Sequence, residues 1–153
     1  MRYQASGMSK LHYKIVTPER LLEEGEADAV TATTESGEIT VLPGHIPLAT
    51  LLRPGEMRVK LAGKESLLAV AGGLLQILPN NEMVILAEEA FRSDELELGA
   101  IEEAKKRAED ALKNIRNRDD VGFADAAAGL ERELAKYRVA LKGKAQRKIS
   151  TEE

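Results

Sequence analysis

The chain has 153 residues, of which 43% are hydrophobic and 31% are charged, with a formal net charge of −4 and no cysteine or tryptophan. The lack of cysteine excludes disulfides, thiolate metal sites and a cysteine nucleophile, and the length allows one ordinary domain or two small ones. No apolar run is long enough to span a bilayer, and the acidic balance argues against general nucleic-acid binding. We therefore expect neither direct membrane insertion nor a nucleic-acid partner.

The composition changes near Ser93. All five prolines lie before this residue, whereas the last 60 residues contain more than half of the charges and no proline. Such a shift marks a change of architecture. We predict a β-sandwich domain over residues 8–92, a helical hairpin over 93–149 and a tail over 150–153. Residues 1–7 are expected to be an N-terminal extension, either disordered or derived from an expression vector.

Short apolar runs alternate with proline, glycine and asparagine turns before this boundary. They cover residues 11–16, 27–34, 39–42, 48–52, 57–61, 67–71, 74–78 and 83–87. About eight short strands without room for helices between them predict an antiparallel sandwich or flattened barrel.

Two of these runs indicate how their strands are buried. Residues 57–61 alternate strictly, so one face meets a core while Arg58 and Lys60 face water. Residues 67–71 are apolar on both faces, as in a strand that is covered twice or lies against a partner. We favour cover from within the chain.

The period changes to three and four residues after Ser93. Apolar residues from Leu98 to Ile115 predict one amphipathic helix, and Asp94 and Glu97 have the spacing of a capping box. The pattern breaks over 114–120 and resumes from Phe123 to Leu141, which predicts a second helix of about twenty residues. The fold class is therefore β + α, an N-terminal antiparallel β-sandwich followed by an antiparallel two-helix hairpin. The apolar stripes are thin, so permanent docking and opening of the hairpin both stay open.

The motifs that carry enzyme chemistry are missing. The sequence has neither a phosphate-binding glycine loop nor the glycine-flanked serine of a nucleophile elbow. His12 and His45 are the two histidines, and neither has the spacing of a metal site. We predict no catalytic residue, no metal and no enzyme activity of the chain by itself.

Two segments are candidates for partner binding. The loop around His45 is stiffened by Pro43, Gly44 and Pro47, so His45 serves either recognition or the capping of a turn. No acid lies between Glu133 and Glu152, where six basic residues either bind an acidic partner or complement the helix dipole.

The order of these features resembles the ε subunit of bacterial F-type ATP synthases. The matching residues are Ser36-Gly37-Glu38, Leu42-Pro43-Gly44-His45-x-Pro47-Leu48, Pro54-Gly55, Gly72-Gly73, the strand end from Ala87 to Ala90, and Tyr137-Arg138-Val139. The resemblance covers residues 8–148. It implies a non-catalytic central-stalk subunit that couples the γ subunit to the membrane rotor ring of a proton-translocating synthase, peripheral on the cytoplasmic face of the bacterial plasma membrane.

The resemblance also implies roles for individual residues. It places Glu38 near the polar loops of the rotor ring and His45 toward γ, with Pro43, Gly44 and Pro47 shaping the same interface. The hairpin is expected to regulate or inhibit ATP hydrolysis, docked on the sandwich in one state and extended toward the catalytic α/β subunits in the other. Its basic residues Arg132, Lys136, Arg138 and Lys142 are the expected regulatory contacts.

Some members of the family bind ATP through a motif like [IL]-D-x-x-R-A at the first helix. The aligned residues begin at Leu96, with Glu97 at the aspartate position and Ala100 at the arginine position. The loss of the arginine removes a charged donor suited to phosphate, although Arg132 and Lys136 stay available on the second helix. We expect no cofactor and no tight ATP sensing, with Glu97, Arg132 and Lys136 as the remaining nucleotide candidates.

A function from another class stays open beside this one. The same two modules would suit a free-standing β-sandwich binding module with a helical dimerisation arm. Such a module needs a concave pocket and stable self-association, and failure to copurify with a γ-like partner would favour it.

Overall fold

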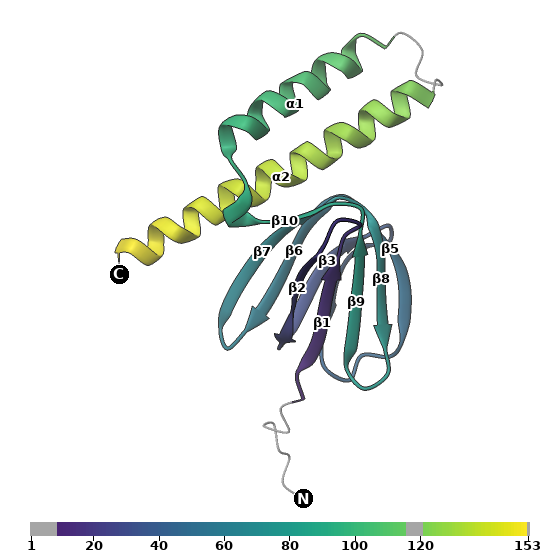
Figure 1. The fold of residues 1–153 in the computed structure, drawn as a ribbon, viewed down its shortest axis with the longest axis vertical. Coiled ribbons are helices and arrows are strands. Elements are labelled where there is room, and N and C mark those ends of the chain that lie inside the picture. The colour runs from purple at the N-terminus through teal and green to yellow at the C-terminus, as the bar shows by residue number, and fades with distance from the viewer. Residues whose placement is uncertain (1–8, 116–120, 153) are drawn as a thin grey trace, which may run out of the picture.

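The computed structural model describes residues 9–115 and 121–152, which form a β module capped by two helices (Figure 1). The strands are β1 (Leu11–Val16), β2 (Leu21–Ala27), β3 (Ala29–Thr34), β4 (Gly37–Val41), β5 (Leu48–Leu52), β6 (Gly55–Leu61), β7 (Lys64–Val70), β8 (Gly73–Leu78), β9 (Glu82–Ala87) and β10 (Ala90–Arg92). A 3-10 turn, η2 (Ser93–Glu95), leads into α1 (Leu98–Lys113) and α2 (Val121–Glu152). The predicted fold class is confirmed. Two predictions concern residues outside the described ones: the N-terminal extension over 1–7, and the break between the helices where it covers residues 116–120.

The strands form one strongly curved sheet in the order β10-β7-β6-β3-β5-β8-β9-β1-β2, with β4 paired to β3. The pairs are antiparallel except β1 with β9, which run parallel. Sequence analysis missed β2 and β10. The run predicted over 27–34 is two strands, because Asp28 interrupts it and accepts hydrogen bonds from Lys10 and from the backbone N–H of Ala62.

The core lies between the two layers of the curved sheet. In β1, Leu11, Tyr13 and Ile15 are buried while His12 and Lys14 face outward, as a period of two requires. Burial, together with the nearby Glu23 carboxylate, raises the pKa of Tyr13 to about 12. This cluster continues through buried side chains of the other strands, so the sandwich has one contiguous core.

The strand that is apolar on both faces is covered twice, as predicted. Leu68 and Val70 of β7 join the sandwich core, whereas Leu67 and Ala69 form a second small cluster with Val139 of α2. The cover comes from within the chain. The same strand therefore holds the sandwich together on one face and holds the hairpin on the other.

The junction between the modules differs from the predicted cap. The N-cap of α1 is Glu97, which makes no side-chain capping bond. Instead, Glu95 Oε2 accepts the backbone N–H of Arg92 at 2.9 Å and closes η2, so the capping box predicted at Asp94 and Glu97 is wrong by two residues. The side chain of Arg92 donates to the carbonyl of Leu22 at 2.6 Å and ties this turn to β2.

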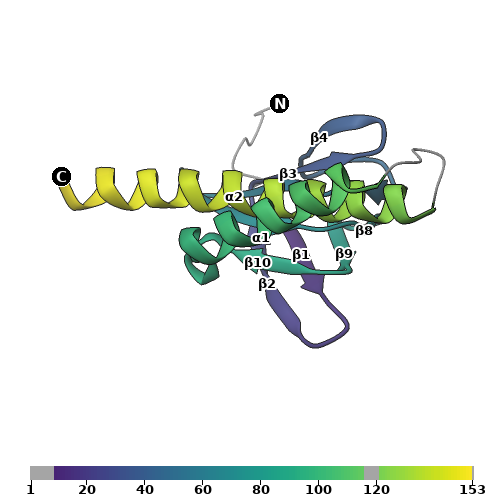
Figure 2. The same cartoon turned by 90° about the horizontal axis from the view of Figure 1, so that it is seen from above.

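Helix α2 lies between α1 and the sandwich, where it contacts β6, β7 and η2. It has 32 residues, longer than the predicted helix, and the predicted tail is helical as far as Glu152. Figure 2 shows the C-terminal part of α2 extending beyond the sandwich. The hairpin is therefore docked in this structure, with an overhanging basic end.

Candidate functional site

The residues predicted to face partners lie at two ends of β4. Glu38 is the second residue of the strand, whereas Pro43, Gly44, His45 and Pro47 belong to the loop that follows it. Glu38 is exposed and accepts a hydrogen bond from Arg58 Nη2 at 2.9 Å. The structure thus separates the predicted rotor-ring residue from the predicted γ-facing loop.

Local bonds define the loop over residues 42–47. The backbone N–H of His45 donates to the carbonyl of Leu42 at 3.1 Å, and Gly44 has a φ of +89°, which favours glycine. The Nδ1 atom of His45 lies within hydrogen-bond distance of the carbonyl oxygen of Ile46, at 2.7 Å. His45 therefore stabilises its own turn, while the neighbouring Ile46 side chain is 75% exposed.

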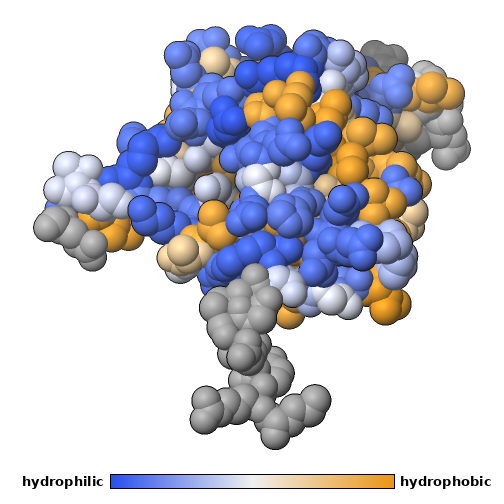
Figure 3. Space-filling model, turned by 60° about the horizontal axis from the view of Figure 1, so that its bottom comes forward, coloured by the Kyte–Doolittle hydropathy of each residue, from blue (hydrophilic) through white to orange (hydrophobic). Residues whose placement is uncertain are grey.

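A row of three leucines, exposed at its two ends and half-buried in the middle, crosses the outer face of β5, β8 and β9. Leu51 pairs with Leu74, and Leu74 pairs with Leu86, so the three side chains lie side by side on one face. Leu51 is 52% and Leu86 is 47% exposed. Figure 3 shows hydrophobic residues gathered on the side of the molecule where these strands lie. Adjacent apolar residues of this kind make the face a candidate interaction site, which the sequence analysis had not identified.

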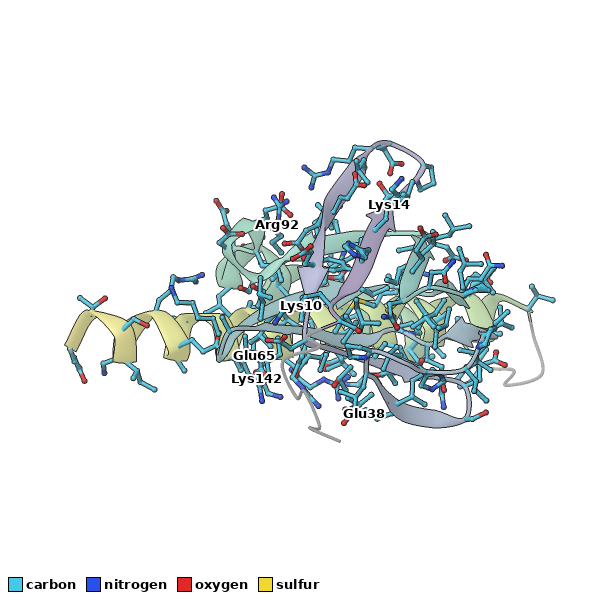
Figure 4. All side chains as sticks on the ribbon, turned by 90° about the horizontal axis from the view of Figure 1, so that it is seen from below. Lys10, Lys14, Glu38, Glu65, Arg92 and Lys142 are labelled. Atoms are coloured by element: carbon cyan, nitrogen blue, oxygen red, sulfur yellow. The ribbon has the colours of Figure 1, made fainter. Side chains whose placement is uncertain are left out.

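A chain of alternating charges runs from β4 to α2. Arg58 bonds Glu38 at 2.9 Å and Glu56 at 3.0 Å, and Lys142 Nζ donates to the other oxygen of Glu56 at 2.7 Å. Figure 4 shows Glu38 and Lys142 on one side of the molecule, with Lys14 and Arg92 on the other. The predicted solvent-facing role of Arg58 is therefore only partly correct, because it is half-buried between two carboxylates.

The Glu56 carboxyl responds to these neighbours. Burial alone would raise its pKa, but the hydrogen bonds from Lys142 and Arg58 outweigh burial and lower the pKa below its ordinary value. The carboxylate is therefore ionised at neutral pH and holds one end of the docked hairpin.

A small residue sets how closely α2 approaches the junction. A Cβ added at Gly143 would lie 2.7 Å from Ser93 Cβ and 2.9 Å from Ser93 Oγ. Real Cβ atoms essentially never approach so closely, so α2 is seated here only because position 143 lacks a side chain. The Gly143–Ser93 contact is a docking point between a turn fixed to the sandwich and the helix above it.

The four basic residues predicted to regulate do not form one patch. Lys136 pairs with Glu133 at 3.2 Å and Glu89 at 3.4 Å and lies 4.9 Å from the centre of the Phe91 ring. Lys142 pairs with Glu56, whereas Arg138 lines a different groove, beside the turn at Arg53 and Pro54. In the docked state two of the four cations are thus engaged within the chain.

The aligned nucleotide motif lines a shallow groove of about 340 Å³ between α1 and α2. Its floor is apolar, with Ala100, Ile101 and Phe91, and its charged lining consists of three carboxylates, Glu95, Glu97 and Glu133, with Lys136. Arg132 precedes Glu133 on α2 and does not line the groove. Polyphosphate would meet more negative than positive charge here.

Within residues 9–115 and 121–152, no helix has the length and apolar character needed to cross a bilayer. The same residues hold no cluster of three or more histidine or acidic side chains arranged to bind a metal ion.

The sequence is similar to known proteins over most of its length. The model of the ATP synthase delta/epsilon chain β-sandwich domain matches residues 10–93. The ATP synthase epsilon chain of Chromobacterium violaceum is 40% identical over 86% of this chain and 93% of its own. That of Dehalococcoides mccartyi is 38% identical over 88% of this chain and 95% of its own.

Solved structures share the fold at lower identity. A chain of the mitochondrial ATP synthase of Euglena gracilis superposes with a TM-score of 0.73 at 21% identity, covering 87% of this chain and 82% of that one. A chain from the central stalk and c-ring of the Tetrahymena thermophila enzyme gives a TM-score of 0.59 at 17% identity, covering 88% and 96%. The sandwich-plus-hairpin architecture is common to these chains. From the matched domain and the relatives near 40% identity, we conclude that the chain belongs to the ATP synthase epsilon-chain family.

Proposed function

We propose that the chain is a non-catalytic rotor subunit that joins the γ subunit to the membrane rotor ring of a proton-translocating ATP synthase. In this proposal it is held on the cytoplasmic face of the bacterial plasma membrane by its partners. Family membership supports the assignment to the complex, and it argues against the free-standing binding module.

The observation that carries the γ contact is the leucine row on β5, β8 and β9. This row lies on different strands from β6 and β7, which contact α2, so the sandwich can bind a partner while the hairpin stays docked. An apolar patch at the centre of the contact is the usual anatomy of a protein interface. Glu38, on the projecting β3–β4 hairpin, is the proposed contact to the polar loops of the ring.

We further propose that the hairpin restrains ATP hydrolysis when it leaves the sandwich. Its docked state depends on the small cluster of Leu67, Ala69 and Val139, on the Glu56–Lys142 ion pair and on the fit of Gly143 against Ser93. On release, Lys142 loses its partner and becomes available to acidic surface on the catalytic α/β subunits. Two states that differ by so few contacts can lie within a few kcal/mol of each other.

We infer that this hairpin does not bind ATP tightly. The side chain of Ala100 supplies no hydrogen-bond donor for phosphate. In the groove, the carboxylates of Glu95, Glu97 and Glu133 outnumber the single ammonium group of Lys136. The double substitution Glu97→Asp and Ala100→Arg restores the aspartate and the arginine of the motif, and calorimetric titration with ATP should detect binding only in that variant. Equal ATP affinity of the native chain would contradict the inference.

The test of the main proposal is reconstitution. A synthase complex stripped of this subunit is combined with the full chain or with a version truncated after Ser93, and binding and ATP hydrolysis are measured. We expect both to bind, and only the full chain to suppress hydrolysis. Circular dichroism of the truncated chain checks that its sandwich is folded.

Other outcomes have distinct meanings. If both chains bind and hydrolysis is the same, the hairpin is not inhibitory although the rotor assignment holds. If neither folded chain binds, the proposed place in the rotor is wrong. Leu86→Ser, which places a hydroxyl at one end of the leucine row, should weaken binding without unfolding the sandwich, since Leu86 is about half exposed.

A further inference from the structure

Asn81 occupies a junction of three segments that are far apart in sequence. It ends the turn between β8 and β9, and both Asn80 and Asn81 have positive φ values, 66° and 62°. Asparagine adopts this left-handed region more readily than most residues. The backbone conformation therefore suits asparagine at both positions. Asn81 differs from Asn80 in its hydrogen bonds to other segments of the chain.

Asn81 accepts hydrogen bonds through both its side chain and its backbone carbonyl. Its side-chain Oδ1 accepts the backbone N–H of Gly44 at 2.6 Å, and its backbone carbonyl accepts the N–H of His12 at 2.8 Å. The residue therefore joins the beginning of β1, the β8–β9 turn and the loop over residues 42–47. Sequence analysis identified this loop as rigid from its prolines but did not identify its anchor.

The anchored loop lies at the opposite end of the strands that carry the leucine row. The loop leads into β5, whose Leu51 is in the row, and Asn81 precedes β9, whose Leu86 is in the row. Among the large hydrophobic residues that the structure describes, Ile46 is the most exposed, at 75%. A loop held in one conformation loses less entropy when a partner covers it.

We propose that Asn81 is a positioning residue for partner docking, which holds Ile46 and His45 in one preorganised conformation at the opposite end of the strands that carry the leucine row. The occupant is the γ subunit, so the docking part of this inference rests on the proposed function. The positioning part rests on the Gly44–Asn81 and His12–Asn81 bonds alone.

The turn offers matched variants. Asn81→Gly keeps the positive φ and the carbonyl that His12 uses, but removes the acceptor for Gly44. Asn80→Gly makes the same change one residue earlier, at a side chain that is exposed, and is the control. Asn81→Asp keeps an acceptor oxygen and is the rescue.

The experiment measures hydrogen exchange of the Gly44 amide, the melting temperature, and the association of each full-length variant with a γ-containing synthase complex depleted of this subunit. In Asn81→Gly, loss of the bond should speed Gly44 exchange about tenfold or more. The unanchored loop should weaken association by roughly three- to tenfold. Asn80→Gly and Asn81→Asp should behave like the native chain in both readouts, and the melting temperatures of the two glycine variants should agree.

Three results would overturn the proposal. Unchanged Gly44 exchange in Asn81→Gly would show that Asn81 does not order the loop. Faster exchange with native association would show that loop order is irrelevant to docking. Equal losses in Asn80→Gly and Asn81→Gly would assign the effect to backbone freedom in the turn. Failure of the native chain itself to associate would instead refute the proposed function, while the exchange data would still decide the positioning role.

Discussion

The two modules of this chain are held in very different ways. The sandwich has a contiguous core in which Leu11, Ile15, Leu68 and Ile85 are fully buried. The hairpin is attached through Leu67, Ala69 and Val139, with a glycine fit and ion pairs around them. The contrast teaches that one strand, β7, connects a large core to a much smaller one, because its two faces belong to different clusters.

Neighbouring leucines of β7 give the largest expected contrast. Leu68→Ala should lower the free energy of unfolding of the sandwich by about 2–5 kcal/mol, because it opens a cavity in the main core. Leu67→Ala removes the same atoms from the hairpin side, so it should loosen the hairpin and leave the sandwich close to native stability. Urea unfolding followed by circular dichroism, together with hydrogen exchange in α2, separates the two. Equal losses in sandwich stability would show that the modules unfold as one unit.

Two glycines of α2 give the next contrast. Gly143→Ala should shift the hairpin toward release by about 1–3 kcal/mol, because the new methyl group overlaps Ser93. Gly129→Ala meets only the tip of Arg132 at 3.8 Å, so it should stabilise α2 by up to about 1 kcal/mol without undocking it. Limited proteolysis between the modules and exchange rates in β7 report the docked fraction. Identical behaviour of the two variants would mean that the Ser93 contact does not control docking.

The Glu56–Lys142 ion pair should contribute less. Lys142 is 57% exposed at its side chain, so solvent screens the pair, and Lys142→Gln should weaken docking by only about 0.5–1 kcal/mol. Glu56→Gln removes the partner of both Lys142 and Arg58, and a double-mutant cycle isolates the Glu56–Lys142 term. A coupling energy of zero between Glu56 and Lys142 at low salt would show that this ion pair does not contribute to docking.

Acid should produce the smallest effect. The pKa of Glu56 in the docked state lies below its ordinary value of 4.5, so its contribution to docking is complete above that pH and is lost as the pH falls through the depressed value. Hairpin protection measured by exchange should therefore begin to fall only when the pH drops below the ordinary Glu56 pKa of 4.5. Glu56→Gln should flatten this part of the profile, and an unchanged profile would assign the acid response to other carboxylates.

Much of the fold could be predicted from local patterns. The alternation in residues 57–61 and the two-sided apolar run at 67–71 predicted which faces are covered. Strand β2 was not predicted because Glu23, Glu24 and Glu26 have low strand propensity. The strand lies at an edge of the sheet, where charged side chains are tolerated. Strand β10 has only three residues, too few to show a period.

The candidate site was less predictable because its parts meet only through non-local pairing. The turn chemistry of Pro43 and Gly44 identified the loop, but its bond to Asn81 joins residues 37 positions apart. The leucine row had one local signal. Leu51-Leu52 and Leu74-Leu75 are adjacent pairs in strands, and neighbours in a strand point to opposite faces, so one leucine of each pair had to be exposed or covered by another element.

The parallel pairing of β1 with β9 affects how the chain is made. Residues 12–16 align with residues 82–86, so the first strand cannot find this neighbour until nearly ninety residues have been synthesised. Such a long closure gives the sandwich a high contact order, and a ribosome-bound chain would carry an incomplete barrel until late in translation. The helices are synthesised only afterwards, when the surface of β7 on which α2 rests has been completed. The order of synthesis thus places the hairpin last, so an error in its folding leaves the finished sandwich intact.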